Sequence, residues 1–524
     1  MCLATTVNEY RNCPDTWSLF WFMHSSHEWA DKDFAFDRII TFFYTVIISS
    51  AESIDNQLFS SLILSFKPVF GKQAFPLRNK LPHRKTVRVI DEKTHGLSFI
   101  NLSRAPPGYG ECSSMTSSVL FTPVGINRMT LKNRIVMPAM ASYHAAVNGE
   151  ATEKLIRYHE ERAKGGVGMN IVEATYVARS GNSFDLGLGI SDDFMIKGLS
   201  KLTDAVHRHD GKIAIQLQHG GRFGNPPTSG CPRLLVSMIP GLAPTENARV
   251  MDADDIEGMV EAYVQAARRA VEAGFDAVEI HGAHGYLISQ FLSPSTNHRK
   301  DEFGGSLQNR MRFMDMVMEE VMKAAGSDMA VLVKMNMRDG FRGGMELDET
   351  MQVARRLEQS GAHALVLSGG FVSKAPMYVM RGEMPIRSMT HYMTCWWLKY
   401  GVRMVGKWMI PSVPFKEAYF LEDALKFRAA LKIPLVYVGG LVSRDKIDEV
   451  LDDGFEAVQM ARALLNEPGF VNRMRAEENA RCNCRHSNYC IARMYSIEMA
   501  CHQHLKEELP PCLKKEIEKI EAKG

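Results

Sequence analysis

Two histidines and a tyrosine stand within six positions in the stretch EIHGAHGYLISQFLSP, which runs from residue 279 to residue 294. They are His281, His284 and Tyr286, and they follow an apolar run that is typical of a buried strand. All three side chains can donate a hydrogen bond. They could therefore polarise a single ligand oxygen on which negative charge develops during a reaction.

The spacing of the two histidines alone leaves two other interpretations open. A His-x-x-His pair can bind zinc, but a catalytic zinc site needs a third protein ligand and an open position. Glu279 is the best placed carboxylate of the motif, and we expect its side chain to point elsewhere on the strand. The histidines could also be structural and cap backbone carbonyls, and spacing by itself favours this structural role.

The elements around these residues form a regular series from Val119 onward. Short aliphatic or β-branched runs alternate with longer amphipathic segments, as in β/α units with a parallel sheet. Strands are predicted at 134–137, 169–174, 212–218, 277–281, 331–335, 364–368, 435–440 and 457–461, and helices between them, for example at 255–274 and 445–454. Eight such repeats predict an α/β protein with a closed (β/α)8 TIM barrel. The competing topology is an open doubly wound sheet, but no Gly-x-Gly-x-x-Gly turn follows the first strand.

Active sites of such barrels lie at the C-terminal ends of the strands. The residues at these ends include Ala139, Met140, Ala174, Gln216, Lys334, Gly439, Gly440, Ala461 and Arg462. Glycine N–H groups and an arginine after the last two strands suit a phosphate, although a tight turn and a surface cation are the alternatives. Lys334 interrupts an apolar strand and needs a partner, which could be a barrel carboxylate or an electron-poor cofactor.

These residues belong to motifs that resemble the Old Yellow Enzyme family of FMN-dependent ene-reductases, also described as NADH:flavin oxidoreductases. The resemblance covers roughly residues 119–480 and rests on LKNRIVMPAM (131–140), IQLQHGGR (215–222), the run from 279 to 313, and the pairs at 439–440 and 461–462. It implies that Ala139, Met140 and Ala174 lie against the flavin ring. It also implies that Gln216 bonds to the pyrimidine edge, that Lys334 lies near N1 and the C2 carbonyl, and that Gly439, Gly440, Ala461 and Arg462 hold the phosphate.

The same resemblance implies the reaction: NADH or NADPH reduces FMN, and flavin N5 delivers a hydride to the β-carbon of an activated alkene, an enone or an enoyl- or dienoyl-type substrate. His281 and His284 would hold the substrate carbonyl oxygen, and Tyr286 would give a proton to the α-carbon. The alternatives are an NAD(P)H oxidase or quinone reductase, and a non-catalytic flavoprotein. The last rests on Ala141, where relatives often carry cysteine or threonine, and on a broken cysteine pattern.

Four of the ten cysteines, Cys482, Cys484, Cys490 and Cys501, gather near the C-terminus. They resemble the iron–sulfur segment of the dienoyl-CoA reductase branch, but Ser487 stands where that pattern has a cysteine. We therefore predict no bound metal and interpret the four thiols as the remnant of a [4Fe–4S] site. Because little chain follows Cys501, we expect a form of that branch without its FAD domain.

The segment between the sixth and seventh predicted strands, residues 370–416, is unusually long. Its basic residues are Lys374, Arg381, Arg387, Lys399, Arg403, Lys407 and Lys416, its single acid is Glu383, and it also holds Trp396, Trp397 and Trp408. A long loop over a barrel mouth is usually functional. We expect a basic, aromatic-walled lid for an anionic or nucleotide-bearing partner, an acyl-CoA or NADPH. The alternative is an excursion that packs on the barrel or on another subunit.

The bulk properties of the chain narrow its partners to small molecules. Its 524 residues carry a formal net charge of +2, which gives no reason to expect nucleic acid or a membrane surface. Residues 1–118 lack periodicity, a spanning segment and a signal peptide, and are expected to be a poorly ordered extension or absent from the mature protein. Residues 119–480 are expected to form the FMN-binding barrel, and residues 481–524 a cysteine-containing segment with a charged helix. The scattered cysteines fit a reducing, cytoplasmic compartment. Formation of a homo-oligomer is possible, and the sequence does not decide it.

Overall fold

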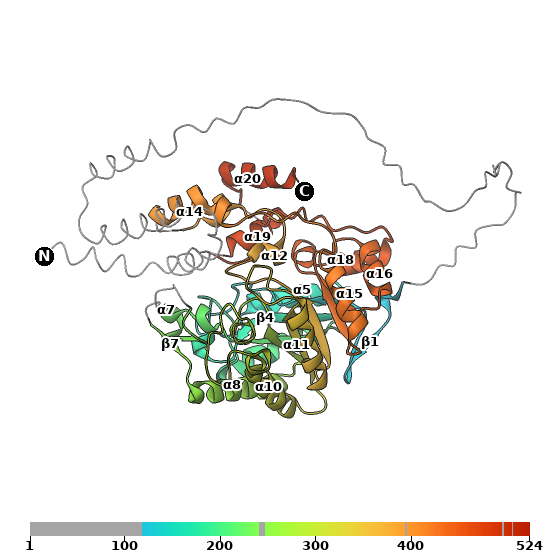
Figure 1. The fold of residues 1–524 in the computed structure, drawn as a ribbon. Coiled ribbons are helices and arrows are strands. Elements are labelled where there is room, and N and C mark those ends of the chain that lie inside the picture. The colour runs from blue at the N-terminus through green and yellow to red at the C-terminus, as the bar shows by residue number, and fades with distance from the viewer. Residues whose placement is uncertain (1–117, 240–246, 394–395, 495–496, 506, 524) are drawn as a thin grey trace, which may run out of the picture. The chain divides into compact units, whose positions relative to one another are not determined.

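The computed structural model describes residues 118–239, 247–393, 396–494, 497–505 and 507–523. Eight parallel strands close into a barrel (Figure 1), which confirms the predicted (β/α)8 fold. The strands are β3 (Ile135–Met137), β4 (Met169–Tyr176), β5 (Lys212–Gln218), β8 (Ala277–Gly282), β9 (Ala330–Asn336), β10 (Ala364–Ser368), β11 (Leu435–Val438) and β12 (Ala457–Gln459). Pairing of β12 with β3 completes the ring. From their sequence, residues 1–118 are expected to be a poorly ordered extension. All of them except Ser118 lie outside the described residues.

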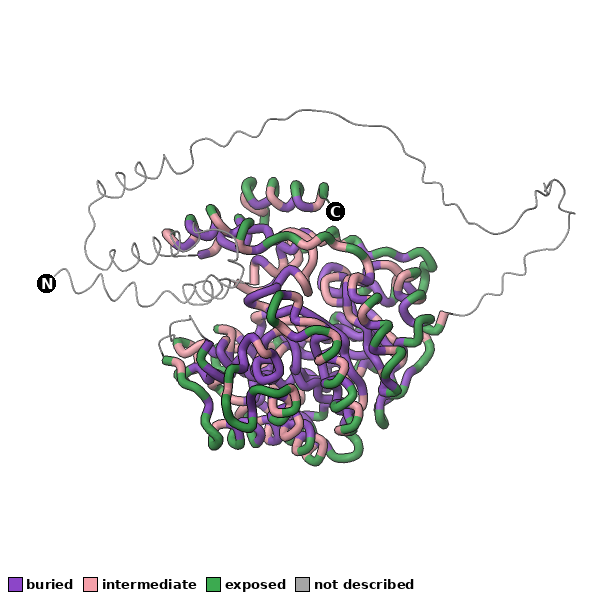
Figure 2. The backbone as a smooth tube through the Cα atoms, in the orientation of Figure 1, coloured by how far each residue is buried: buried purple, intermediate pink, exposed green. Residues whose placement is uncertain are grey.

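Helices that connect or follow the strands surround the barrel. They are α5 (Glu153–Lys164), α6 (Ile196–His207), α7 (Pro226–Ser229), α8 (Ala253–Glu272), α9 (Leu287–Leu292), α10 (Leu307–Ala325), α11 (Leu347–Gln359), α15 (Leu421–Ala430), α16 (Arg444–Asp452), α17 (Arg462–Asn466) and α18 (Phe470–Ala476). The helix predicted at 255–274 begins at Ala253, because Asp252 accepts a hydrogen bond from the Asp255 N–H at 2.9 Å and caps the helix. Figure 2 shows the result, with buried strands inside and exposed outer helix faces.

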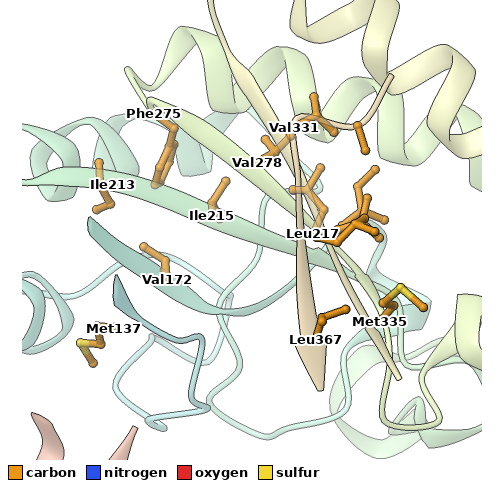
Figure 3. Close-up of a cluster of buried hydrophobic side chains, with 14 of the residues drawn as sticks. Met137, Val172, Ile213, Ile215, Leu217, Phe275, Val278, Val331, Met335 and Leu367 are labelled. Atoms are coloured by element: carbon orange, nitrogen blue, oxygen red, sulfur yellow. The ribbon is translucent and has the colours of Figure 1, made fainter. Parts of the chain in front are cut away.

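The hydrophobic core has two layers because neighbouring strand residues point to opposite faces of the sheet. Outward-facing side chains such as Ile215, Val278 and Val331 pack under the helices (Figure 3). Inward-facing residues at the N-terminal end of the barrel are small or aliphatic, and a hairpin of β1 (Val124–Ile126) and β2 (Met129–Leu131) packs against them. The N-terminal end is therefore filled, and the C-terminal end remains available for a site.

About half of the predicted lid segment, residues 370–416, is helical. It contains α12 (Pro376–Met380), α13 (Ile386–Met389) and α14 (Trp396–Met409), and α19 (Tyr489–Arg493) and α20 (Pro511–Glu521) from the C-terminal segment lie against it. Its small core is rich in methionine, with Met377, Met384, Met389 and Met393 packed beside Ala492 of α19. A short parallel pair, β6 (Arg233–Leu235) and β7 (Ala248–Val250), lies before α8. Among the described residues, no helix is both long and apolar enough to cross a membrane.

Candidate active site

The inner face of the barrel changes from apolar to polar toward the C-terminal ends of β5, β8 and β9. Residues two apart on a strand share a face. The apolar inner residues Ala214, Ala277 and Leu332 are therefore followed on the same face by Gln216, by Glu279 with His281, and by Lys334. These polar side chains are buried, so the surrounding structure must satisfy them.

Glu279 joins Gln216 and Lys334 into one buried group. Its carboxylate is 0% exposed, and Lys334 Nζ lies 3.2 Å from its Oε2 atom. Gln216 Nε2 donates to the same oxygen at 2.5 Å. Lys334 therefore has the carboxylate partner that one interpretation of the sequence required, and its role at the flavin stays a prediction.

The expectation that Glu279 points elsewhere on the strand is wrong. Residues 279 and 281 are separated by two positions, so the carboxylate and the imidazole face the same interior. Glu279 is thus a site residue that the sequence analysis missed. The strand period of two was the signal that would have found it.

The structure brings His281, His284 and Tyr286 together. The His281 ring centre is 5.1 Å from that of His284 and 4.9 Å from that of Tyr286. His281 Nδ1 accepts the Ala283 N–H at 3.4 Å, which assigns the ring proton to Nε2. His284 Nε2 lies 2.8 Å from Ser368 Oγ. The rings thus bind a backbone N–H and a hydroxyl, rather than the backbone carbonyls that a capping role would require.

Both imidazoles are neutral at physiological pH. Burial lowers the pKa of His281 well below its usual value of 6.5, and the neighbouring His284 and Lys334 lower it further. Burial, with a smaller effect of Lys334, lowers the pKa of His284 to about 3. A neutral imidazole has one N–H donor and one acceptor, so each ring can donate one hydrogen bond without bringing charge into the site. Within the described parts of the chain, no group of three or more His, Cys, Asp or Glu residues could hold a metal ion.

A turn with left-handed backbone positions His284 just after the end of β8. His284 has a φ of 61° and Gly285 a φ of 83°, both in the left-handed region that non-glycine residues rarely adopt. The His284 carbonyl accepts the Val372 N–H at 3.0 Å, and residue 284 forms a parallel bridge with Phe371. The segment after β10 therefore fixes this turn, which explains how the strain persists.

The three residues predicted to contact the flavin ring lie at the same end of the barrel. Ala139 and Met140 follow β3, and Ala174 lies opposite Gln216 in the β4–β5 register, just past a bulge at Glu173. All three side chains are half-buried, as expected for residues that line a cavity wall. Their contact with a flavin remains a prediction.

The predicted phosphate residues follow neighbouring strands, Gly439 and Gly440 after β11 and Ala461 and Arg462 after β12. Gly440 has a φ of 74°, and a Cβ there would lie 2.6 Å from the Tyr419 ring. The position therefore requires glycine both for its backbone and for its close contact. Arg462 Nη1 donates to Asn488 Oδ1 at 2.6 Å.

Arg381 is a second arginine beside this site, and the sequence analysis did not assign it there. Its guanidinium lies 4.6 Å from the Tyr419 ring centre, and its backbone carbonyl accepts from Asn488 Nδ2 at 2.7 Å. Asn488 thus links Arg381 to Arg462. The buried Nε of Arg381 has no hydrogen-bond partner among the described residues. Nothing in the local sequence could reveal this, because Arg381 comes from the lid segment.

These residues fit FMN. A phosphate would pair with Arg462 and would satisfy the buried Nε of Arg381. A flavin pyrimidine edge carries both donors and acceptors, and the barrel interior offers polar atoms without partners among the described residues, namely Glu279 Oε1 and both amide atoms of Gln459. A buried polar atom without a hydrogen-bond partner lowers the stability of the folded protein by about 1–3 kcal/mol. A polar cofactor that bonds to these atoms would restore that stability.

The four clustered cysteines form no disulfide bonds. Cys501 Sγ accepts from Asn466 Nδ2 at 3.3 Å, and Cys482 Sγ lies 3.6 Å from Asn466 Oδ1. Burial raises the pKa of Cys482 and of Cys490 to about 12, so both side chains are thiols in the metal-free chain. The absence of a bound cluster remains a prediction.

Comparisons with known proteins identify the family of the chain. The profile of the NADH:flavin oxidoreductase / NADH oxidase family matches residues 119–390. The chain is 37% identical to the 4,4'-dithiodibutanoate disulfide reductase of Rhodococcus erythropolis over 381 residues, which cover 72% of this chain and 93% of that enzyme. It is 38% identical to the NADH oxidase of Thermoanaerobacter brockii over 352 residues, which cover 67% of this chain and 49% of that enzyme.

A solved Old Yellow Enzyme homologue from Zymomonas mobilis superposes with a TM-score of 0.54 at 26% identity, and the match covers 70% of this chain and 94% of that one. The barrel and the family match together define a flavin-dependent oxidoreductase. The chain belongs to the NADH:flavin oxidoreductase / NADH oxidase family, that is, to the Old Yellow Enzyme-like FMN enzymes that use NADH or NADPH.

Proposed function

We propose that this enzyme reduces the activated C=C bond of a small α,β-unsaturated carbonyl compound, with NADH or NADPH as the reductant. One observation carries the proposal: at the barrel mouth, the centre of the His281 ring lies 5.1 Å from that of His284 and 4.9 Å from that of Tyr286. The enone, enoyl and dienoyl substrates implied by the sequence, whether free or CoA-linked, share the carbonyl oxygen that such donors recognise.

The two histidines would act on that carbonyl oxygen. When bound, FMN supplies the hydride that it has taken from NAD(P)H. His281 donates from Nε2, and His284 donates from Nδ1 when the Ser368 hydroxyl donates to its Nε2 atom. Charge builds on the oxygen only as the β-carbon gains the hydride, so each donor favours the transition state, by about 2.7–4 kcal/mol.

Tyr286 would complete the reduction by transferring its hydroxyl proton to the α-carbon. Hydride at one carbon and a proton at the other saturate the bond and leave the carbonyl neutral. The enolate is a much stronger base than a phenolate, so this transfer is downhill despite the weak acidity of tyrosine. Lys334, held by Glu279 at 3.2 Å, would face the cofactor with its remaining N–H donors, and Gln216 would bond to the pyrimidine edge.

A second candidate is an NAD(P)H oxidase, or a reductase of quinones or disulfides. The relatives from T. brockii and R. erythropolis are named as an NADH oxidase and a disulfide reductase. Oxygen and the S–S bond of a disulfide have no carbonyl oxygen for the histidines to polarise, whereas a quinone has one, so only the oxidase and the disulfide reductase are separated from an enone reductase by this criterion. These two activities therefore differ from enone reduction in their dependence on His281 and His284, while a non-catalytic flavoprotein would show no turnover with any acceptor.

The test measures the two half-reactions separately with the purified full-length chain. Flavin reduction by NADH or NADPH is followed under anaerobic conditions, and the reduced enzyme is then mixed with enones, enoyl-CoA esters, quinones, 4,4'-dithiodibutanoate or oxygen. We expect His281→Ala and His284→Ala each to slow reoxidation by enones by about 10²–10³-fold. Reoxidation by oxygen should change little.

His209→Ala is the matched control, because this histidine precedes β5 at the opposite end of the barrel and lies 3.5 Å from Glu160. It should leave both half-reactions unchanged. Enone reoxidation that survives both site variants would refute the role of the two histidines, and wild-type enzyme that oxygen or a disulfide reoxidises but enones do not would overturn the proposal in favour of the second candidate. Protein purified without a flavin spectrum, and without flavin uptake, would indicate a non-catalytic barrel.

A further inference from the structure

A groove outside the barrel mouth lies between α13, α14 and α20. Its volume is about 660 Å³, within the range of pockets that hold small molecules. Its lining residues are Ile386, Arg387, Tyr400, Arg403, Lys407, Cys512, Lys515, Glu516 and Lys519. Figure 1 shows α14 and α20, which form two of its walls.

Helical periodicity explains how this groove arises. On α20, Cys512, Lys515, Glu516 and Lys519 recur at intervals of three and four residues and share one face. Leu513, Ile517 and Ile520 lie on a different face of α20, which is buried. On α14, residues 400, 403 and 407 repeat in the same way. Two charged helix faces are thus turned toward one another.

The charge of the groove is strongly unbalanced, with five cations against one carboxylate. That carboxylate is already engaged, because Glu516 accepts the backbone N–H groups of Arg387 at 2.9 Å and Ser388 at 2.8 Å. Lys407 is paired with Glu383 at 2.9 Å. Among the described residues, no carboxylate lies within ion-pairing distance of Arg387, Lys515 or Lys519. Clustered like charges repel, so an anion would be bound favourably here.

Aromatic side chains accompany these cations. Tyr400 lines the groove and is 59% exposed, and Trp396 and Trp408 on the same helix are 63% and 66% exposed. An exposed aromatic ring can stack on a flat heterocycle, and neighbouring cations without a carboxylate partner can bind phosphates of the same ligand. The concave shape fits such a small ligand better than a membrane surface or a flat protein interface.

We propose that this groove binds an adenine nucleotide that carries two or more phosphate groups, the chemistry shared by the nucleotide end of a CoA thioester and by NADPH. Tyr400 stacks on the base, and Arg387, Lys515 and Lys519 bind the phosphates. Whether that nucleotide belongs to the substrate or to the reductant rests on the proposed function, whereas nucleotide binding in the groove does not. If the groove binds no nucleotide, the proposed function can still be tested, and if the proposed function fails, nucleotide binding can still be tested.

The test is a titration of the FMN-bound full-length enzyme by calorimetry with adenosine 3′,5′-bisphosphate, adenosine 2′,5′-bisphosphate and adenosine, none of which can be reduced. We expect both bisphosphates to bind more tightly than adenosine, and their affinity to fall as salt is added. A preference for the 3′,5′ isomer identifies the CoA end, and a preference for the 2′,5′ isomer identifies NADPH.

The double variant Lys515→Glu with Lys519→Glu should weaken bisphosphate binding by about 100-fold, roughly tenfold for each lost cation. Lys514→Glu on the same helix is the control, because Lys514 is exposed but does not line the groove; it should change the affinity by less than about twofold. Flavin content and the rate with a small enone should stay the same in both variants. Absence of bisphosphate binding, or equal affinity of the double variant and wild type, would overturn the proposal.

Discussion

The buried pair of Glu279 and Lys334 predicts that substitutions of these two residues have strongly non-additive effects on the free energy of unfolding. The change is Glu279→Gln, which keeps the shape of the side chain and removes its charge. Glu279 is 0% exposed, and Lys334 Nζ lies 3.2 Å from its carboxylate. After the substitution Lys334 would remain in the barrel interior without a counter-charge, which is the costly state for a buried ion.

The magnitude follows from the burial of both partners. Removing one member of a buried ion pair costs about 3–5 kcal/mol of unfolding free energy, since the other charge stays desolvated. With an unfolding entropy of about 2.1 cal/mol/K per residue over roughly 400 residues, this corresponds to a drop of about 4–6 °C in melting temperature. Lys334→Met should cost a similar amount, because it leaves Glu279 charged and unpaired.

The assay is a double-mutant cycle on the melting temperature, with Glu279→Gln, Lys334→Met and the combination. We expect the double variant to regain most of the stability that each single variant loses, because it contains no unpaired buried charge. The flavin spectrum of each variant is recorded alongside to compare equal cofactor contents. Losses that simply add in the double variant would refute the argument that these two residues neutralise each other in the barrel.

Two further predictions concern the turn and a buried carboxyl group. Gly285→Ala should lower the free energy of unfolding by about 1–2 kcal/mol because residue 285 has a left-handed backbone, and by more because the new Cβ would lie 2.3 Å from the Phe371 ring. The same substitution should slow enone reoxidation. The control is Gly343→Ala, which has a similar φ of 82° and open space around it, and it should lower stability only. Burial raises the pKa of Glu173 from 4.5 to about 7, so the folded state binds more protons than the unfolded state between these values. Stability should therefore fall as pH rises from about 4.5 to 7, by on the order of 3 kcal/mol, and Glu173→Gln should flatten this dependence in melting curves measured across that range. Equal rates of enone reoxidation in Gly285→Ala and wild type, or an unchanged pH profile in Glu173→Gln, would contradict these two arguments.

The sequence by itself determined the barrel and most of the residues at its mouth. Each predicted strand overlaps a strand of the structure, because a strand buried between the barrel interior and the helices needs a continuous apolar run. The triplet of His281, His284 and Tyr286 could also be found from sequence. These residues lie on one short segment, where the local order of the chain dictates their proximity.

Only the tertiary structure decided which groups meet across different segments. Glu279, Gln216 and Lys334 lie on three neighbouring strands, and their pairing depends on strand register, which the sequence pattern does not state. Arg381 reaches the neighbourhood of Arg462 because the lid segment folds into helices and Asn488 links the two. The cationic groove likewise requires α14 and α20, which are far apart in sequence. Local periodicity fixes which face of an element is polar, whereas long-range packing alone decides what that face meets.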